Sequence, residues 1–188
     1  MNEEQFKRSA ALLSNFKTRS EITLEEIPAP QRLAKFSYAL SADVSNGLLG
    51  DNEAELANGR FVVLHEPGGQ DSWEGEFRCV TFLNADLDND EADDPTLPEH
   101  GWKWLLKALD ENGCKYTAPS GTVTRAISKS FGKLSTDTDG GEIEIRASWT
   151  ALITKPEELT EHLQAWCNLL AEISYLQPIP EGVASFRR

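Results

Sequence analysis

The sequence predicts an α+β fold, with helices packed on one face of a five-stranded antiparallel sheet in the order α-β-β-β-α-β-β-α. Three observations predict it. Some segments repeat apolar residues at helical spacing, others alternate between apolar and polar residues, and connections rich in Pro, Gly and Asp separate them. A chain of 188 residues suffices for one domain. We therefore expect a single α+β domain over residues 1–176 and a C-terminal tail over residues 177–188.

The first expected element is an amphipathic helix over residues 6–16, where apolar side chains recur at helical spacing: Phe6, Ala10, Leu13 and Phe16. Two prolines in "EEIPAPQ" end it. The following "FSYALSADV", residues 36–44, alternates strictly and predicts a strand with one buried face. Leu33, Phe36, Leu40 and Val44 would also fit a helix, so the helical alternative stays open here.

Two strands joined by a hairpin loop are expected next. "RFVVLHE", residues 60–66, is a short apolar run rich in β-branched residues. "PGGQDSWEG", residues 67–75, has the composition of the loop, and "EFRCVTFLNADL", residues 76–87, is the returning strand. Both faces of the returning strand are partly apolar, which indicates a central position in the sheet.

The second half predicts a helix, two strands and a last helix. Thr96 and Glu99 have capping-box spacing ahead of a helix that Gly113 ends. Strands follow over residues 121–131 and 142–153, the second with the clearest alternation in the chain. Thr154 and Glu157 repeat the capping-box spacing, and the helix behind them has an apolar stripe that includes Leu159, Leu163, Trp166, Leu170 and Ile173.

Net charge is concentrated in the middle of the chain. Residues 43–111 contain 17 acidic and four basic side chains, which accounts for the whole net charge of −13. This charge opposes binding to nucleic acids and anionic membranes. A solvated acidic face and a docking surface for a basic partner are the two interpretations. The docking surface would use the acidic connection after residue 85, at Asp86, Asp88, Asp90, Glu91, Asp93 and Asp94.

The sequence also predicts a cytoplasmic protein without cofactors. Cys79, Cys114 and Cys167 are widely spaced, which is typical of reduced thiols rather than of a zinc site. The N-terminus has acidic residues where a secretory leader needs cations, and no apolar run approaches a membrane span.

The acidic stretch "LNADLDNDEADDP" resembles a calcium loop in its alternating Asp86, Asp88 and Asp90. Counting from Asp86, however, Glu91 takes the position that needs Gly, and Leu97 takes that of the bidentate Glu. The three histidines, His65, His100 and His162, are far apart, and we place His162 on the charged flank of its helix. We therefore expect no metal site.

Longer phrases carry a family resemblance: "PAPQRLAKFSYAL", "GRFVVLHEPGGQDSWEGEFRCVTF", "GTVTRAISKSFG" and "EIRASWT". They resemble the actinobacterial family called domain of unknown function 3000, over about residues 27–170. The family is uncharacterised, so the resemblance implies no reaction, ligand or site residue. The order of elements also resembles the small acidic chaperones of type III secretion systems, which are homodimers; no motif is shared.

One group of residues suggests a ligand site. Trp73 and Glu74 lie in the expected hairpin loop, and Arg78, Arg125 and Arg146 lie on three strands. If the arginines shared a face, they would form a cationic patch for a carboxylate or phosphate. The alternative is that each arginine pairs with a sheet acid such as Glu76, Glu142 or Glu144.

Two hypotheses of function follow, since no signature of a nucleotide loop or a catalytic nucleophile appears. The first is a non-enzymatic acidic binding or adaptor module, chaperone-like, with a basic protein or a second copy of the chain as its partner. The second is a protein or enzyme that binds a small anionic molecule through the arginine patch near residues 67–75. Nucleic-acid mimicry is a third alternative, but the acids sit in one loop rather than at regular spacing. Trp102 and Trp104 point to different sides of their helix, so one of them is free to cover a ligand or a neighbouring subunit.

Overall fold

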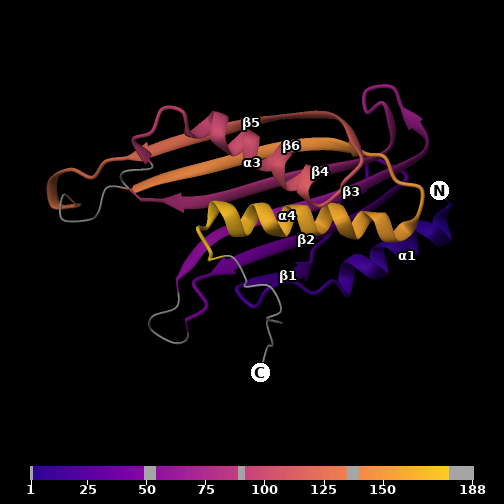
Figure 1. The fold of residues 1–188 in the computed structure, drawn as a ribbon, viewed down its shortest axis with the longest axis horizontal. Helices are drawn as coiled ribbons and strands as arrows, with labels where there is room; N and C mark the ends of the chain where they lie inside the picture. The colour runs from indigo at the N-terminus through magenta and orange to yellow at the C-terminus, as the bar shows by residue number, and fades with distance from the viewer. Residues whose placement is uncertain (1, 49–53, 89–91, 135–139, 178–188) are drawn as a thin grey trace.

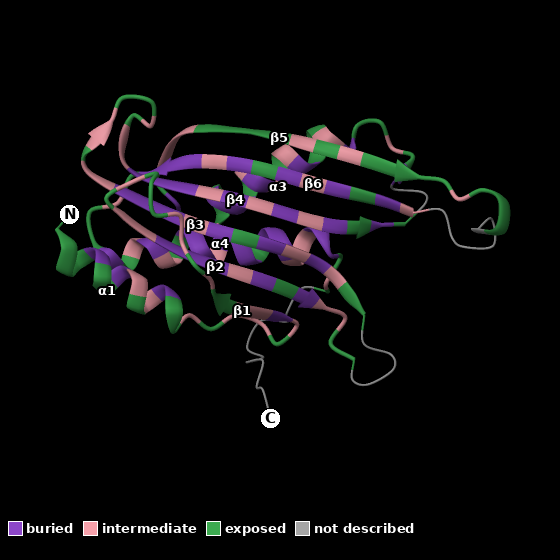
Figure 2. Ribbon diagram, turned by 180° about the vertical axis from the view of Figure 1, so that it is seen from behind, coloured by how far each residue is buried: buried purple, intermediate pink, exposed green. Residues whose placement is uncertain are grey.

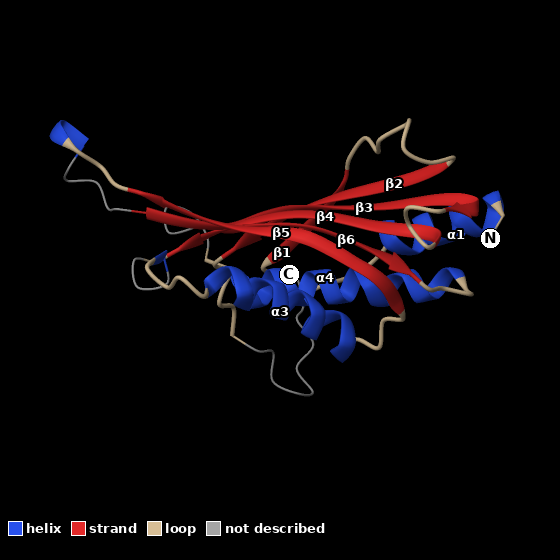
Figure 3. Ribbon diagram, turned by 90° about the horizontal axis from the view of Figure 1, so that it is seen from above, coloured by secondary structure: helices blue, strands red, loops and turns tan. Residues whose placement is uncertain are grey.

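The computed structural model describes residues 2–48, 54–88, 92–134 and 140–177. These residues form a six-stranded antiparallel sheet in the order β1-β2-β3-β4-β6-β5, with α-helices on one side of it (Figures 1 and 3). The α+β class and the antiparallel sheet are thus confirmed. The elements are α1 (Glu3–Ser14), β1 (Ile22–Glu26), β2 (Phe36–Ser45), β3 (Glu55–Gln70), β4 (Gly75–Leu87), α3 (Leu97–Glu111), β5 (Tyr116–Ser128), η2 (Gly132–Leu134), β6 (Gly140–Ala151), η3 (Pro156–Glu158) and α4 (Leu159–Ile173).

The expected count of five strands is wrong, because β1 precedes β2 and pairs with it. β1 is only five residues long and ends just before Pro28, so its sequence offers little alternation to detect. Ile22 opposite Val44 and Leu24 opposite Ala42 hold it at the sheet edge. The observed order is therefore α-β-β-β-β-α-β-β-α, with the helical alternative for residues 33–44 excluded by β2.

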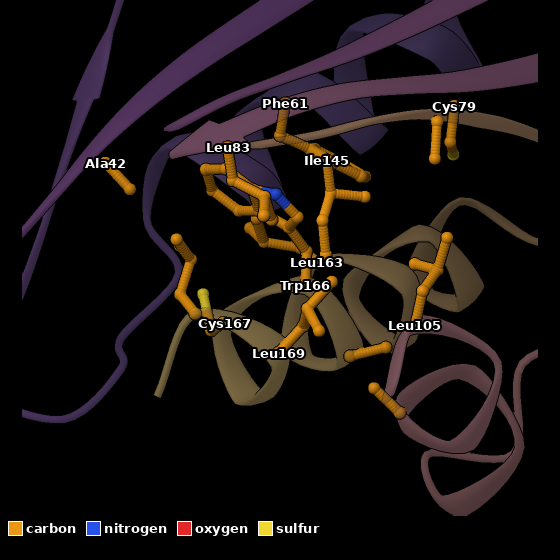
Figure 4. Close-up of a cluster of buried hydrophobic side chains, with 14 of the residues drawn as sticks. Ala42, Phe61, Cys79, Leu83, Leu105, Ile145, Leu163, Trp166, Cys167 and Leu169 are labelled. Atoms are coloured by element: carbon orange, nitrogen blue, oxygen red, sulfur yellow. The ribbon is translucent and has the colours of Figure 1, made fainter. Parts of the chain in front are cut away.

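The core lies between the sheet and α4. Figure 4 shows Trp166 and Leu163 of α4 directed at Phe61, Leu83 and Ile145 of the sheet. The rings of Trp166 and Phe61 are 5.4 Å apart, and Trp166 is buried. Gly59 makes this approach possible, because a Cβ at that position would come within 2.9 Å of the Trp166 ring. The expected buried stripe of the last helix is confirmed.

Both expected capping boxes differ from the observed helix starts. Thr96 makes no side-chain cap bond to α3; its hydroxyl donates to Asp94 instead, at 2.7 Å. Before α4 the acceptor is Glu158 rather than Glu157, and its carboxylate receives the backbone N–H groups of Thr154 and Lys155. The reason is that the short helix η3 begins the turn, which shifts the register of α4.

His162 is buried rather than exposed on a charged flank, which corrects our expectation. Its Nδ1 accepts a hydrogen bond of 3.0 Å from Nε1 of Trp149, on β6. Burial lowers the pKa of His162 to about 4, so the ring is neutral and can accept that bond. The described α-helices are 12 to 15 residues long, and none of the described helices could cross a membrane.

Candidate functional site

One face of the sheet has no described helix over it, and we call it the open face. Successive side chains of a strand point to opposite faces, so the even-numbered residues of β3, β4 and β6 lie here. Figure 2 looks onto this face, where buried and more exposed residues alternate along β3, β4 and β6. This face of the sheet can be reached by a ligand, whereas the opposite face is filled by the helix-covered core.

Two arginines flank an aromatic ring in the middle of the open face. Arg60 of β3 lies directly opposite Phe82 of β4, and Phe82 lies directly opposite Arg146 of β6. Neighbouring strands are about 4.8 Å apart, so the two arginine backbones stand about 10 Å apart across the ring. The guanidinium of Arg146 is 5.7 Å from the centre of the Phe82 ring. We call these three residues the arginine row.

Apolar side chains line the sheet beside the arginine row. Val62 and Val80 are opposite one another, and Ser148 continues the line on β6. They border two adjoining hollows with volumes of about 440 and 380 Å³, which share Val80 and Ser148. The first hollow includes the arginine row, and the second reaches under the loop between β3 and β4.

Arg78 forms the far end of the second hollow and is only 7% exposed. Its guanidinium donates to the carbonyl of Ala118 and to three hydroxyls, those of Ser120, Ser148 and Thr150, at 2.7–3.0 Å. Burial lowers the pKa of Arg78, yet an arginine remains protonated in proteins. None of these four acceptors carries a negative charge, so Arg78 brings a positive charge to this end of the hollow.

The loop between β3 and β4 covers the second hollow. Trp73 and Ser72 line that hollow together with Leu33, which is exposed. The carbonyl of Trp73 accepts a hydrogen bond from the Thr150 hydroxyl, which fixes the loop over Arg78. Glu74 is exposed, does not line the hollow, and has a φ of 60°, a backbone conformation required by the tight turn.

The three arginines expected from the sequence do not share a face. Arg78 and Arg146 are on the open face, whereas Arg125 is on the helix-covered side, where it donates to the carbonyl of Ala92 at 2.7 Å. Arg146 also contacts Glu144 at 3.1 Å, as in the ion-pair alternative, but the Arg146 side chain is 65% exposed. Such an exposed pair is weak and leaves Arg146 able to contact a ligand.

The acidic residues expected to bind a partner are partly used within the fold. Asp94 accepts hydrogen bonds from the backbone and hydroxyl of Thr96. Asp86, Asp88 and Asp93 are exposed. Two further residues of this set, Asp90 and Glu91, lie outside the described residues. Asp86 of β4 lies directly opposite Glu142 of β6, so two acidic side chains are neighbours at this end of the open face.

Sequence reasoning missed Arg60, Phe82 and the two valines. The sequence does show that Arg60 and Phe82 lie on the face opposite the core, because each is followed by a residue of the apolar face, Phe61 and Leu83. Alternation also separates Arg125 from Arg78 and Arg146. Arg125 lies two residues after Val123 and is therefore on the same, apolar face of β5. The pairing register was needed to bring Arg60, Phe82 and Arg146 into one row.

Residues lining the two hollows can bind but offer little for acid–base chemistry. Among the described residues, no His, Cys, Asp or Glu lines either hollow. Guanidinium groups hold carboxylate, sulfonate or phosphate groups, and an aromatic ring with valines accepts an apolar body. The arrangement therefore suits an amphipathic anion.

Comparisons with known proteins give a family and no function. The family model described as protein of unknown function (DUF3000) matches residues 2–184, a longer span than the resemblance in the sequence suggested. No curated protein and no solved structure matches this chain. Because the family model covers nearly the whole chain, this chain belongs to the DUF3000 family.

Proposed function

We propose that this chain is a non-enzymatic binding protein whose open face holds a small anion with an apolar body. The arginine row carries the proposal: two cations, on the strands on either side of β4, flank one half-exposed aromatic ring in direct register. The sheet fixes this geometry before any ligand arrives, so little ordering cost is paid on binding. The ring of the ligand would lie on Phe82, and its anionic group would reach Arg60 and Arg146.

Local charge favours this site despite the net charge of −13. In the part of the chain that the structure describes, no ion pair holds Arg60, and the ion pair of Arg146 with Glu144 is exposed. Arg78 adds a buried positive charge at the end of the second hollow. A ligand that extends along Val80 would thus approach a third cation.

The test is binding of anilinonaphthalene sulfonate, an anionic aromatic dye, compared with N-phenylnaphthylamine, which has the same rings without the sulfonate. We expect the anionic dye to bind more tightly. Arg60→Met and Arg146→Met should each weaken its binding about tenfold, the effect of losing one charged hydrogen bond, and leave the neutral dye unaffected. Phe82→Ser should weaken the binding of both dyes.

Lys7→Met is the matched control, because it removes an exposed cation of α1 that, like Arg146, has one exposed ion-pair partner. Equal affinity for the two dyes, or anionic-dye binding that survives both arginine substitutions, contradicts the proposal. Circular dichroism and the unfolding midpoint of each variant establish that the fold is intact, since this dye also binds partly unfolded chains.

A second function, docking of a basic partner at the acidic end of the open face, is favoured by one observation. Asp86 and Glu142 are opposite one another on neighbouring strands, an arrangement of like charges that costs stability unless a cation approaches. Oligolysine should bind at low salt, and Asp86→Asn together with Glu142→Gln should weaken that binding. Unchanged binding in the double variant would remove this candidate.

A further inference from the structure

The longest exposed edge of the sheet belongs to β5. It is 13 residues long and, except for Ala118 and Pro119 at a register shift, pairs with β6 on one side only, because β5 ends the strand order. In the described part of the chain, no backbone hydrogen bond joins residues 121–128 to anything except their own strand pair. The opposite edge, β1, has five residues. An unpaired edge of this length is a template for another strand.

An apolar hollow of about 480 Å³ adjoins this edge. Pro98 and Trp102 of α3 line it, together with Gly121 and Val123 of β5. Trp102 is half-buried, and so is Trp104, so neither tryptophan is fully in the core. A strand added to β5 would cover this hollow as well as the free backbone groups, and its alternate side chains would enter it.

The charges at the edge are nearly balanced, unlike those of the whole chain. Glu99 and Lys103 border the hollow, one helical turn apart on α3, and β5 itself contains Arg125 and no acid. A strongly acidic or strongly basic partner would therefore gain little here. A second copy gains more, because Glu99 of each copy can face Lys103 of the other.

The hollow is also centred on the strand. Thr122 is the midpoint of Tyr116–Ser128, and the two residues of β5 that line the hollow, Gly121 and Val123, are its neighbours. A two-fold axis at Thr122 would pair residues 120–124 with their copies, the stretch that lies beyond the register shift at Ala118 and Pro119 in both strands. In that register Arg125 is opposite Pro119 of the second copy, so no like charges oppose one another.

We propose that two copies of this chain form a homodimer by pairing β5 with β5, antiparallel about a two-fold axis at Thr122, which joins the two sheets into one. The Trp102 side chains and the two hollows form the apolar centre of this interface, and the reciprocal Glu99–Lys103 pairs lie beside it. The dimer is independent of ligand binding at the arginine row.

Cysteine substitution tests the pairing and its register. In the dimer the two Cβ atoms at position 122 would be about 4.5–5.5 Å apart, close to the spacing of a disulfide. Mild oxidation of Thr122→Cys should therefore give a covalent dimer on a non-reducing gel. Thr124→Cys is the matched control, because its copy would lie about 13 Å away, too far for a disulfide. The native cysteines are buried, so the unsubstituted chain should not crosslink.

Charge substitution tests the reciprocal pairs by sedimentation equilibrium. Lys103→Glu sets like charges against each other twice and should weaken dimerisation about tenfold. Glu99→Lys combined with Lys103→Glu restores opposite charges and should restore the affinity. A chain that sediments as a monomer at its highest soluble concentration overturns the proposal. Crosslinking at position 124 as readily as at position 122 does so too.

Discussion

The two faces of the sheet are built from the same strands but have opposite properties. Phe61 and Ile145 on the helix-covered face are almost completely buried, whereas Arg60 and Arg146, their neighbours in the chain, are exposed on the open face. One face is packed under α4, and the other displays charged and aromatic groups on a rigid surface. Because the side chains alternate, a change on one face should leave the other intact. Stability and recognition are then separable.

The largest expected effect is on the helix-covered face, from Trp166→Ala. This ring packs against Phe61 and is buried, so its removal leaves a cavity and should lower the free energy of unfolding by about 3–5 kcal/mol. Phe82→Ala on the open face should lower it by about 1 kcal/mol, because that ring is already half-exposed. Urea unfolding measures both. Equal losses would refute the division between the two faces.

Arg78 is an exception that sharpens the comparison, because it is buried although it lies on the open face. Arg78→Met leaves the Thr150, Ser148 and Ser120 hydroxyls without their donor, and we expect a loss of about 1–3 kcal/mol. Arg146→Met should change stability by less than about 0.5 kcal/mol, since its ion pair is exposed. The same urea titration distinguishes these outcomes, and comparable losses would show that Arg146 has a structural role.

A further comparison is a pH dependence that arises on the helix-covered face. His65 stacks between aromatic rings, 4.1 Å from Phe77, and neither ring nitrogen has a hydrogen-bond partner among the described residues. Burial lowers its pKa, although the Glu76 carboxylate is 3.7 Å away. The unfolded chain therefore binds a proton more readily than the folded one. The contribution of His65 to the free energy of unfolding should be fully present above about pH 6.5 and should decrease as the pH drops toward the folded pKa.

His162 contributes in the same direction between pH 6.5 and its folded pKa of about 4. Each histidine adds a slope of up to about 1.4 kcal/mol per pH unit. His65→Phe should reduce the slope and raise stability, because the new ring fits between Phe6, Phe36 and Phe77 and has no polar atoms to bury. His100→Gln is the control, since His100 is exposed. Unfolding free energies measured from pH 7 to pH 4.5 test this. An unchanged slope in His65→Phe would show that His65 is not neutral in the fold.

Much of the fold follows from local patterns. Alternation of apolar and polar residues predicts β2, β4, β6 and the central part of β3, and the apolar stripe predicts α4. These predictions succeed because the residue period of a strand or helix determines which of its side chains are buried. β1 escaped detection because five residues hold too few alternations, and it is stable only through its pairing with β2. Of the site suggested from the sequence, Trp73 and Arg78 line one hollow, whereas Glu74, Arg125 and Arg146 do not line it. That these residues bind a ligand stays a prediction.

The sequence by itself determined which residues are apolar on each element, and hence the α+β class, the antiparallel sheet and the anchoring of the last helix. It also determined the net charge and the acidic middle of the chain. Only the tertiary structure decided that Arg60, Phe82 and Arg146 form a row, that Arg125 is on the other face, and that β5 is the last strand of the sheet formed by the described residues. The physical reason is that alternation is local, within one strand. Register and strand order depend on pairings between residues up to 72 positions apart, as for Arg78 and Thr150.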